Sequence, residues 1–207
     1  MKAELSLTEH GAAAGSARRL PAPERRAALV RAALAVFAST SYARATTVEI
    51  ARAAGVSEPI LYRHFPSKRE LWFACLDAAW ADVRIVIEEK VRLLVDGAVV
   101  PEVELRSPWQ SPLMPNLWLQ GIAEAGDPAI HDRVRNHMGE VHDFVTELFR
   151  SLQHGGAMPA DRDPSAEAWI FVSGGLLRSV ADRLGGVLST ADLAAIGRER
   201  RRWLCGS

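Results

Sequence analysis

The amino-acid sequence predicts an all-α protein, in which a small N-terminal unit is joined by one long helix to a larger helical C-terminal unit. Apolar residues recur at helical spacing along most of the 207 residues. Several of these runs begin with a helix-capping residue and end at glycine, and none alternates as a strand would. Hydrophobic residues make up 48% of the chain, which fits a globular protein with a packed core.

The first predicted helix covers residues 24–40. Its apolar residues fall on one face and are Val30, Ala33, Leu34 and Phe37. The helix should therefore pack beneath the elements that follow it and complete a three-helix unit. Residues 1–22 are expected to form a disordered tail that ends between Pro21 and Pro23.

Two short helices joined by a tight turn are predicted next. Thr46 can cap the first of them, and Glu49, three residues on, completes a capping box. Gly55 ends this helix, because glycine adopts the left-handed conformation that a sharp turn needs. Ser57 is the expected cap of the second helix, and Pro59 is tolerated in its first turn. This is the pattern of a helix-turn-helix, whose second helix enters the major groove of DNA.

The second helix of this motif has an apolar and a polar face. The apolar residues, which should pack inward, are Ile60, Leu61 and Phe65. Ser67 and Glu70 form another capping box, which opens the long helix and places Lys68 in its first turn. A cation at that position can meet a DNA phosphate.

The formal net charge is zero, but the charge is divided unevenly. Residues 1–70 contain 11 Lys and Arg against 6 Asp and Glu, whereas residues 71–207 contain 14 against 19. Positive potential therefore falls on the half that would face phosphates. Arg18 and Arg19 could extend it as an arm in the minor groove, although a disordered tail is the favoured interpretation.

These residues resemble the TetR family of transcriptional regulators. The resemblance runs from Arg26 to Trp72, and two positions depart from the usual pattern, Ser41 and Pro59. The matching residues are an Ala-rich helix ending in Val36-Phe37, then Thr46 to Ala51, Ala54-Gly55-Val56-Ser57, Leu61-Tyr62, His64-Phe65 and Ser67-Lys68. The resemblance implies an N-terminal helix-turn-helix DNA-binding domain over residues 23–70 and a helical ligand-binding and dimerisation domain over residues 71–207.

The resemblance also implies the residues that contact DNA. Those expected to anchor phosphates are Thr46, Thr47, Ser57, Tyr62, His64 and Lys68. Those expected to lie nearest the bases are Glu58, Pro59 and Ile60. A carboxylate such as Glu58 can accept a hydrogen bond from a cytosine amine, provided that it points into the groove.

The C-terminal unit is predicted to contain helices over residues 67–95, 116–125, 127–153, 163–184 and 189–203. Residues 97–115 are rich in proline and are expected to be irregular. The long first helix should bury one apolar face, made of Leu71, Cys75, Ala78, Ala79, Val83 and Val86. The starts at residues 127 and 163 are marked by Asp-Pro, a cap followed by a proline in the first turn.

An apolar pocket for a small aromatic or lipophilic effector is predicted in this unit, because tryptophans flank a segment that cannot form one regular helix. The predicted lining residues are Trp109, Met114, Leu117, Trp118, Phe144 and Trp169. The alternative is that most of these side chains belong to the core or to an interface.

A homodimer interface is expected on the last two helices. Gly174 and Gly175 lie within a helix, where each glycine costs roughly 1 kcal/mol relative to alanine, so that close approach of another helix would offset the cost. The resemblance implies that these helices pair with their copies; the residues expected to take part are Gly174, Gly175, Leu176, Arg178, Leu193, Ile196 and Arg200. Packing within one chain is the alternative.

Other site types are not favoured. His137 and Glu140 share a helix face, but no further ligand pair completes a metal site, and solvated polar faces account better for the histidines. The run from Arg198 to Arg202 is more typical of a solvated helix face than of a nucleic-acid patch. The sequence shows no cofactor motif, secretory signal or membrane span, and two distant cysteines suit a reducing cytoplasm.

The predicted function is a cytoplasmic DNA-binding transcriptional regulator, a repressor released from a palindromic operator by a small molecule. Two alternatives remain at this point. One is an enzyme that uses the C-terminal cavity, although no nucleophile–base pair or metal site is recognisable there. The other is a DNA-binding or partner-binding protein whose C-terminal bundle only dimerises.

Overall fold

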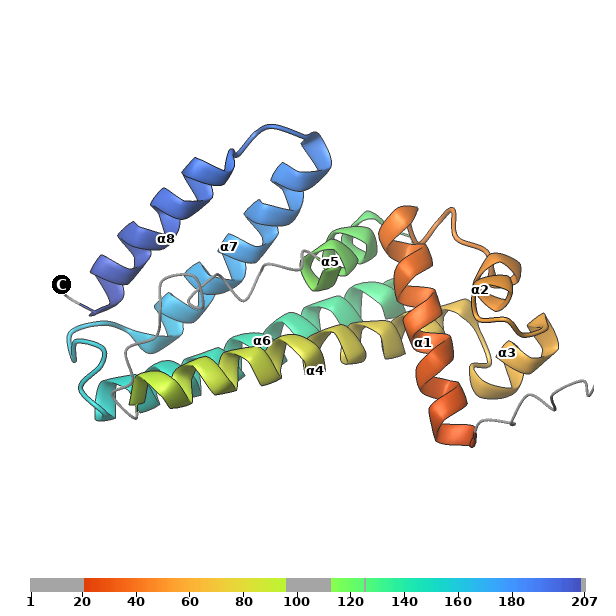
Figure 1. Ribbon diagram of the computed structural model, residues 1–207, viewed down its shortest axis with the longest axis horizontal. Coiled ribbons are helices and arrows are strands. Elements are labelled where there is room, and N and C mark those ends of the chain that lie inside the picture. Colours follow the sequence, from red (N-terminus) through yellow and green to blue (C-terminus); the bar gives the residue numbers. More distant parts are fainter. Residues whose placement is uncertain (1–20, 96–112, 125, 206–207) are drawn as a thin grey trace, which may run out of the picture.

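The computed structural model describes residues 21–95, 113–124 and 126–205, and within them it is built from α-helices with no strand (Figure 1). The all-α prediction is confirmed. The disordered tail predicted for residues 1–22 lies almost wholly outside the described residues, as does Trp109. The helices are α1 (Ala22–Ser39), α2 (Thr47–Ala53), α3 (Glu58–His64), α4 (Lys68–Val95), α5 (Leu113–Ala123), α6 (Pro128–His154), α7 (Pro164–Leu184) and α8 (Thr190–Cys205).

The short helices α2 and α3 lie at one end of the molecule, with α1 between them and the rest of the bundle (Figure 1). α4 and α6 run side by side along the long axis, α5 bridges them towards α1, and α7 packs on α6. α8 lies on the far side of α7, away from α2 and α3. The predicted arrangement of a three-helix N-terminal unit, a long connecting helix and a C-terminal bundle is therefore present.

One continuous core runs through both units. The predicted inner face of α1 is buried, and Phe37 near the end of the helix has no exposed surface. Trp72 near the start of α4 is also fully buried and is in the same cluster as residues of α5 and α6. Burial of large aromatic side chains is the main stabilising contribution to such a core.

Two predicted details of the helices were wrong. α5 begins at Leu113 rather than at residue 116, because Pro115 occupies its third position, where the backbone nitrogen has no intrahelical partner to lose. On α4 the apolar stripe drifts after Val83, so that Val86 is 44% exposed and its neighbour Ile87 is buried instead. Within the described residues, no helix is long and apolar enough to cross a membrane.

Candidate DNA-binding surface and effector region

The turn between α2 and α3 is set by its capping contacts. Thr46 and Glu49 form the predicted capping box, with each side chain bonded to the other's backbone nitrogen. This pairing lowers the pKa of Glu49, because the backbone amide and hydroxyl of Thr46 both donate to the carboxylate. At the other end of α2, Gly55 has a φ of +66°, its amide bonds the Arg52 carbonyl, and the Val56 amide bonds Ala51. These two bonds form a Schellman motif, which fixes the direction in which α3 leaves.

Three polar side chains meet across this turn. The Thr47 hydroxyl on α2 donates to the Glu58 carboxylate on α3, and the Tyr62 hydroxyl lies 3.3 Å from the same Thr47 oxygen. Because the single hydroxyl proton of Thr47 is used towards Glu58, Tyr62 is the donor in the second contact. A phosphate oxygen approaching these hydroxyls would therefore compete with Glu58 for the Thr47 proton and with Thr47 for the Tyr62 proton.

The remaining predicted DNA contacts surround this cluster. Ser57 and Pro59 are exposed, while Ile60 and His64 are half-buried. Ser57 lies at the N-cap as predicted, but its side chain makes no capping hydrogen bond, so its hydroxyl is available for another acceptor. Whether these residues contact DNA stays a prediction.

Lys68 has a structural role that the sequence did not predict, and its phosphate contact stays a prediction. Its ammonium donates to the carbonyls of Tyr42 and Ala45, at 2.9 and 3.1 Å, and lies 4.4 Å from the centre of the Tyr42 ring. An ammonium has three protons, so one remains for a phosphate. The Ser67 hydroxyl accepts from the amide of Glu70, as expected of the cap that opens α4.

α5 connects the DNA-binding end to the bundle. Gln120 is buried, and its side-chain nitrogen donates to the Phe37 carbonyl near the end of α1, at 2.8 Å. At Gly121 a β-carbon would lie 2.5 Å from a Val134 methyl and 2.7 Å from the Trp72 ring, so glycine is needed for this approach. A displacement of α5 would therefore disturb its hydrogen bond to α1.

A group of aromatic rings lies where α4, α5 and α6 meet; Trp80, Trp118, His137 and Phe144 are called the aromatic cluster below. Trp118 Nε1 donates to His137 Nδ1 across 3.0 Å. The Trp80 ring meets both the His137 and Phe144 rings edge-on, with centroids 6.5 and 5.2 Å apart. Burial, followed by the nearby Arg133, lowers the pKa of His137 to about 4.

The sequence-based interpretation of His137 as a solvated residue was wrong, because its side chain has no exposed surface. The missed signal was its spacing: with Val134, Val141 and Val145 it continues the apolar face of α6. Within the described residues, no group of three or more His, Cys, Asp and Glu side chains is placed to hold a metal ion.

The predicted pocket residues lie in different surroundings. Met114, Leu117 and Trp118 are fully buried in the core, while Phe144 is half-buried. Trp169 is 48% exposed on α7 and stacks on His142, with ring centroids 4.3 Å apart. The structure therefore brings Trp118 and Phe144 into the aromatic cluster and leaves Trp169 apart from it.

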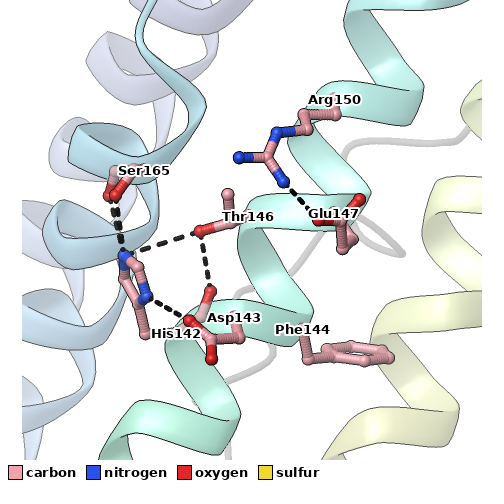
Figure 2. Close-up of a pocket in the computed structure, with 7 residues that line it drawn as sticks. All are labelled: His142, Asp143, Phe144, Thr146, Glu147, Arg150 and Ser165. Atoms are coloured by element: carbon pink, nitrogen blue, oxygen red, sulfur yellow. Dashed lines mark hydrogen bonds and ion pairs between the residues drawn. The ribbon is translucent and has the colours of Figure 1, made fainter.

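A separate hollow opens on the surface of α6 beside the start of α7 (Figure 2). Its lining includes Phe144 together with polar residues: His142, Asp143, Thr146, Glu147, Arg150 and Ser165. His142 Nε2 lies 3.1 Å from the Ser165 hydroxyl, and its Nδ1 lies 3.0 Å from the Asp143 carboxylate. A serine, a histidine and an aspartate are therefore linked in series, an arrangement that sequence reasoning did not find.

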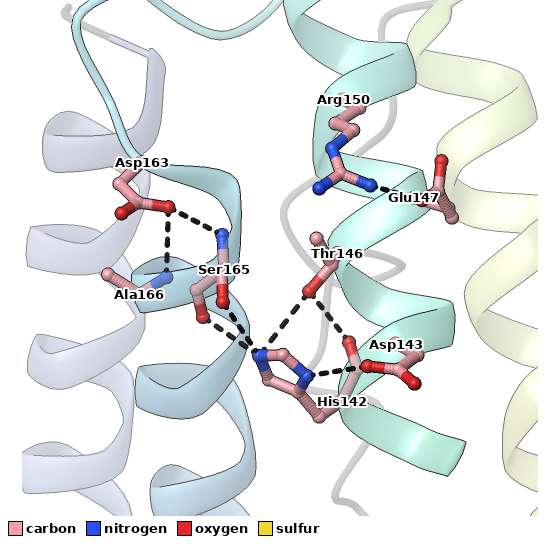
Figure 3. Close-up of polar contacts among 8 residues, drawn as sticks. All are labelled: His142, Asp143, Thr146, Glu147, Arg150, Asp163, Ser165 and Ala166. Carbon is pink, nitrogen blue, oxygen red and sulfur yellow. Dashed lines mark hydrogen bonds and ion pairs between the residues drawn. The ribbon is translucent and has the colours of Figure 1, made fainter. Parts of the chain in front are cut away.

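The surroundings of this series do not favour catalysis. His142 Nε2 also lies 3.2 Å from the Ser165 carbonyl and 3.5 Å from the Thr146 hydroxyl, so this nitrogen is shared among three oxygen atoms and is not directed at the Ser165 hydroxyl alone. The amides of Ser165 and Ala166, the nearest candidates for stabilising an oxyanion, are already bonded to the Asp163 carboxylate (Figure 3). The contact is better described as a tether between α6 and α7.

α7 and α8 carry the largest group of exposed apolar side chains among the described residues. On α7 the exposed residues recur on one face; they are Ile170, Leu177, Val180 and Leu184. Gly174 lies within this face and has no atom within 4 Å of the position of a β-carbon. On α8, Ile196 is 45% exposed.

The other predicted interface residues are partly engaged within the chain. Gly175 is buried, and Leu176 and Leu193 are half-buried. Arg178 pairs with Asp182 at 3.1 Å, and Arg200 pairs with the buried Glu167. Sequence reasoning chose Leu176, whereas the neighbouring Leu177 is the exposed leucine. The interface itself stays a prediction.

Comparisons with known proteins agree with this geometry. A family model described as "Bacterial regulatory proteins, tetR family" matches residues 29–75, from the middle of α1 to the start of α4. The chain is 50% identical over 79 residues to the HTH-type transcriptional activator FasR of Mycolicibacterium smegmatis, a match that covers 38% of this chain and 36% of FasR. It is 35% identical over 72 residues to the nucleoid occlusion factor SlmA of Marinobacter nauticus, covering 33% of this chain and 37% of SlmA.

These two relatives are thus matched over little more than a third of their length. Beyond the N-terminal unit the likeness is one of fold. The transcriptional regulator FadR from Bacillus subtilis, solved in complex with stearoyl-CoA, superposes with a TM-score of 0.61 over 86% of this chain and 97% of FadR, at 12% identity. The helix-turn-helix geometry and the family match lead to the same conclusion: residues 29–75 are the helix-turn-helix part of a domain typical of the TetR family of bacterial regulatory proteins, and the chain as a whole shares the fold of solved TetR-family regulators.

Proposed function

We propose that this protein is a DNA-binding transcriptional regulator, a repressor that a small molecule releases from a palindromic operator. The observation that carries the proposal is the exposed surface of α2 and α3, where Thr47, Glu58 and Tyr62 meet beside a turn fixed by two caps. A rigid turn presents α3 as a unit to the major groove. Access to DNA in a bacterium implies a cytoplasmic protein.

DNA would be contacted in two ways. Hydroxyls at Thr46, Thr47, Ser57 and Tyr62, His64 and the free proton of Lys68 would bond phosphates and set the register. Glu58, Pro59 and Ile60 would face the bases. If a phosphate takes the protons of Thr47 and Tyr62, the Glu58 carboxylate is released and can accept from a cytosine amine.

Dimerisation would place two copies of α3 on one face of the duplex. The exposed apolar face of α7 that contains Gly174 supports this, because apolar residues gathered on one exposed helix face are typical of protein–protein interfaces. Two reading helices related by a two-fold axis would contact half-sites about 34 Å apart, which requires a palindromic operator.

Control by a ligand would act through the bundle. A molecule bound against the aromatic cluster would contact α5 through Trp118, and α5 reaches α1 through Gln120. The Arg69–Asp127 ion pair, at 3.2 Å, links the start of α4 to the start of α6 as a second connection. A ligand changes DNA affinity only by binding one arrangement of these helices better than the other.

The two alternative functions are less well supported. Acyl transfer at Ser165 would need a base directed at its hydroxyl and an oxyanion site, but His142 Nε2 is shared among several oxygen atoms and the nearby amides are bonded to Asp163. A bundle that served only for dimerisation would not explain why His137 Nε2 is buried without a hydrogen-bond partner. Fold neighbours such as FadR, solved with stearoyl-CoA, are consistent with a bundle that accommodates ligands.

Selection of bound sequences from a random duplex library by the purified protein tests the proposal. The expected result is enrichment of a palindrome with half-sites about one helical turn apart. A protein in which Thr47 and Tyr62 are both replaced, Thr47→Val with Tyr62→Phe, is the matched control and should enrich weakly or not at all. Absence of enrichment by the folded wild-type protein at low salt contradicts the proposed function.

A further inference from the structure

The protonation state of His137 follows from its neighbour. Trp118 Nε1 donates to His137 Nδ1, and an indole nitrogen can only donate. Nδ1 is therefore unprotonated, and the single proton of the neutral ring is on Nε2. Because burial keeps the pKa of His137 near 4, this neutral tautomer is the one present at pH 7.

His137 Nε2 is consequently a donor without an acceptor. It is fully buried, and no atom of the described residues accepts a hydrogen bond from it. The Leu76 carbonyl lies near enough to raise the pKa of the ring slightly but does not meet hydrogen-bond geometry. Buried donors are nearly always paired in folded proteins, so an oxygen atom delivered to this nitrogen would be bound favourably.

The neighbours of the His137 ring are aromatic, and the outer rings of the cluster reach the protein surface. Trp80 and Trp118 each meet the His137 ring edge-on, with centroids 6.5 and 5.8 Å away. Trp80 and Phe144 are only half-buried, so the cluster has a side that faces solvent. Edge-to-face packing against such rings suits a flat aromatic molecule.

Charge at the cluster disfavours an anion. Arg84, which lies 5.1 Å from the centre of the Phe144 ring, is bonded to Glu88 at 2.8 Å. Arg133 is paired with both Asp77 and Glu140, and these two carboxylates also act on His137. The arginines nearest the cluster are therefore already neutralised, and a carboxylate ligand would meet net negative charge.

We propose that the effector is an uncharged aromatic compound with a carbonyl oxygen, which lies against the aromatic cluster and accepts a hydrogen bond from His137 Nε2. The inference rests on the proposed function, since it names the ligand class for the control described above. Trp118 would transmit the binding event, because it bonds the other nitrogen of the same ring and belongs to α5.

Matched probes test the ligand class. Acetophenone, 2-acetylnaphthalene and 4-acetylbiphenyl are each compared with the ethyl hydrocarbon and the carboxylate of the same ring system, by tryptophan fluorescence. At least one ketone should bind about tenfold more tightly than its hydrocarbon, as expected for one hydrogen bond of about 1.4 kcal/mol. It should also bind more tightly than its carboxylate. Equal binding of ketone and hydrocarbon for every ring system, or no binding by any ketone, overturns the inference.

Nitrogen NMR of histidine-labelled protein identifies the residue involved. The ketone that binds should shift the Nε2 signal that is missing from His137→Gln. That variant keeps a donor near the same place and should retain part of the ketone preference, whereas His137→Phe should abolish it. His154→Gln, at an exposed position on α6, is the control and should bind as the wild type does. A ketone preference that survives in folded His137→Phe overturns the inference.

The two proposals fail in different ways. If the protein selects a palindrome but shows no ketone preference, the ligand class is wrong and the proposed DNA-binding function stands. If ketones bind through His137 but no DNA is selected, the ligand site stands without the regulatory role. Should His137→Phe not fold, the comparison of matched probes on the wild-type protein still decides.

Discussion

Trp203 Nε1 on α8 donates a hydrogen bond to the Glu167 carboxylate on α7 across 2.8 Å. The other oxygen of Glu167 pairs with Arg200, also on α8, and the Glu167 side chain is only 5% exposed. The Arg162 guanidinium covers the Trp203 ring at 3.7 Å. Most of α8 is exposed, so this polar contact, together with the packing of Leu204 against the core, attaches the second half of the helix to the bundle.

Glu167→Ala should therefore loosen α8. It leaves the Trp203 nitrogen and the partly buried Arg200 without their acceptor, which should lower the free energy of unfolding by about 2 kcal/mol. Hydrogen exchange should accelerate in α8 more than in α6. Glu199→Ala removes the exposed partner of Arg202 and serves as the control, with an expected loss below about 1 kcal/mol. Unchanged exchange in α8 would show that other contacts hold the helix.

The buried His137 should make stability depend on pH. Its pKa is about 4 when folded against an ordinary value of 6.5, so between these pH values the unfolded chain binds the extra proton. Stability is therefore complete above pH 6.5 and decreases as the pH falls, by up to about 3 kcal/mol near pH 4. Urea unfolding measured at pH 7.5, 6 and 5 should show the decline, and His137→Gln should flatten it. A wild-type profile that is flat from pH 7.5 to 5 would rule out this assignment.

Gly121→Ala should disturb the junction of the two units. The new methyl would overlap Val134 and the ring of Trp72, both of which are buried and cannot move away easily. Overpacking of this kind costs roughly 1–3 kcal/mol, which would outweigh the gain in helix propensity. Thermal unfolding gives the change. Gly139→Ala on α6 meets no atom within 4 Å and should be neutral or stabilising.

Gly174→Ala distinguishes an exposed helix face from an interface. Within one chain the methyl meets nothing within 4 Å, so the substitution should stabilise a monomer by up to about 1 kcal/mol. If the α7 face pairs with a copy, the methyl should hold the helices apart and raise the dimer dissociation constant. Sedimentation equilibrium of this variant and of Gly139→Ala separates the cases. Dimerisation that is equally strong in both variants would place the interface elsewhere.

Tyr62→Phe and Lys68→Ala, both in the predicted DNA-binding surface, should affect DNA binding and protein stability differently. Tyr62→Phe should weaken operator binding by roughly 1 kcal/mol if its hydroxyl bonds a phosphate. Lys68→Ala should weaken binding to all sequences and lower the salt slope by about 1, and should also destabilise the segment whose Tyr42 and Ala45 carbonyls it bonds. Binding measured over a range of salt concentrations, alongside unfolding, separates the two effects. A salt slope equal to that of the wild type would exclude a phosphate contact by Lys68.

The sequence was most informative where local chemistry decides structure. The Thr46–Glu49 box, the glycine turn at Gly55 and the two Asp-Pro helix starts depend on neighbouring residues, and all were predicted correctly. The missing side-chain bond at Ser57 shows the limit, since a suitable residue at a cap need not use its hydroxyl there.

Contacts between residues that are far apart in the sequence could not be predicted in the same way. The spacing of His137 along α6 indicated burial and was overlooked, but nothing in the sequence indicated its partner on another helix. Its bond to Trp118 joins residues 19 apart in sequence, and the Gln120–Phe37 bond joins residues 83 apart. The series at Ser165 and His142 was missed for the same reason. The spacing of residues in the sequence indicates which side chains share a face of one helix. The pairs described here lie on different helices and come together only when those helices pack.

The bond from Gln120 to the Phe37 carbonyl bears on how regulators of this type can be recombined. Chimeric repressors are made by exchanging the reading head of one protein for that of another, on the assumption that the head is a self-contained module. Here a head that ended at residue 75, where the family match ends, would carry Phe37 away from Gln120 and Trp72 away from Gly121, the glycine that accommodates its ring. We expect such a chimera to keep the operator preference of its head but to lose its response to ligand. Transferring the matching face of α5 together with the head should prevent this loss.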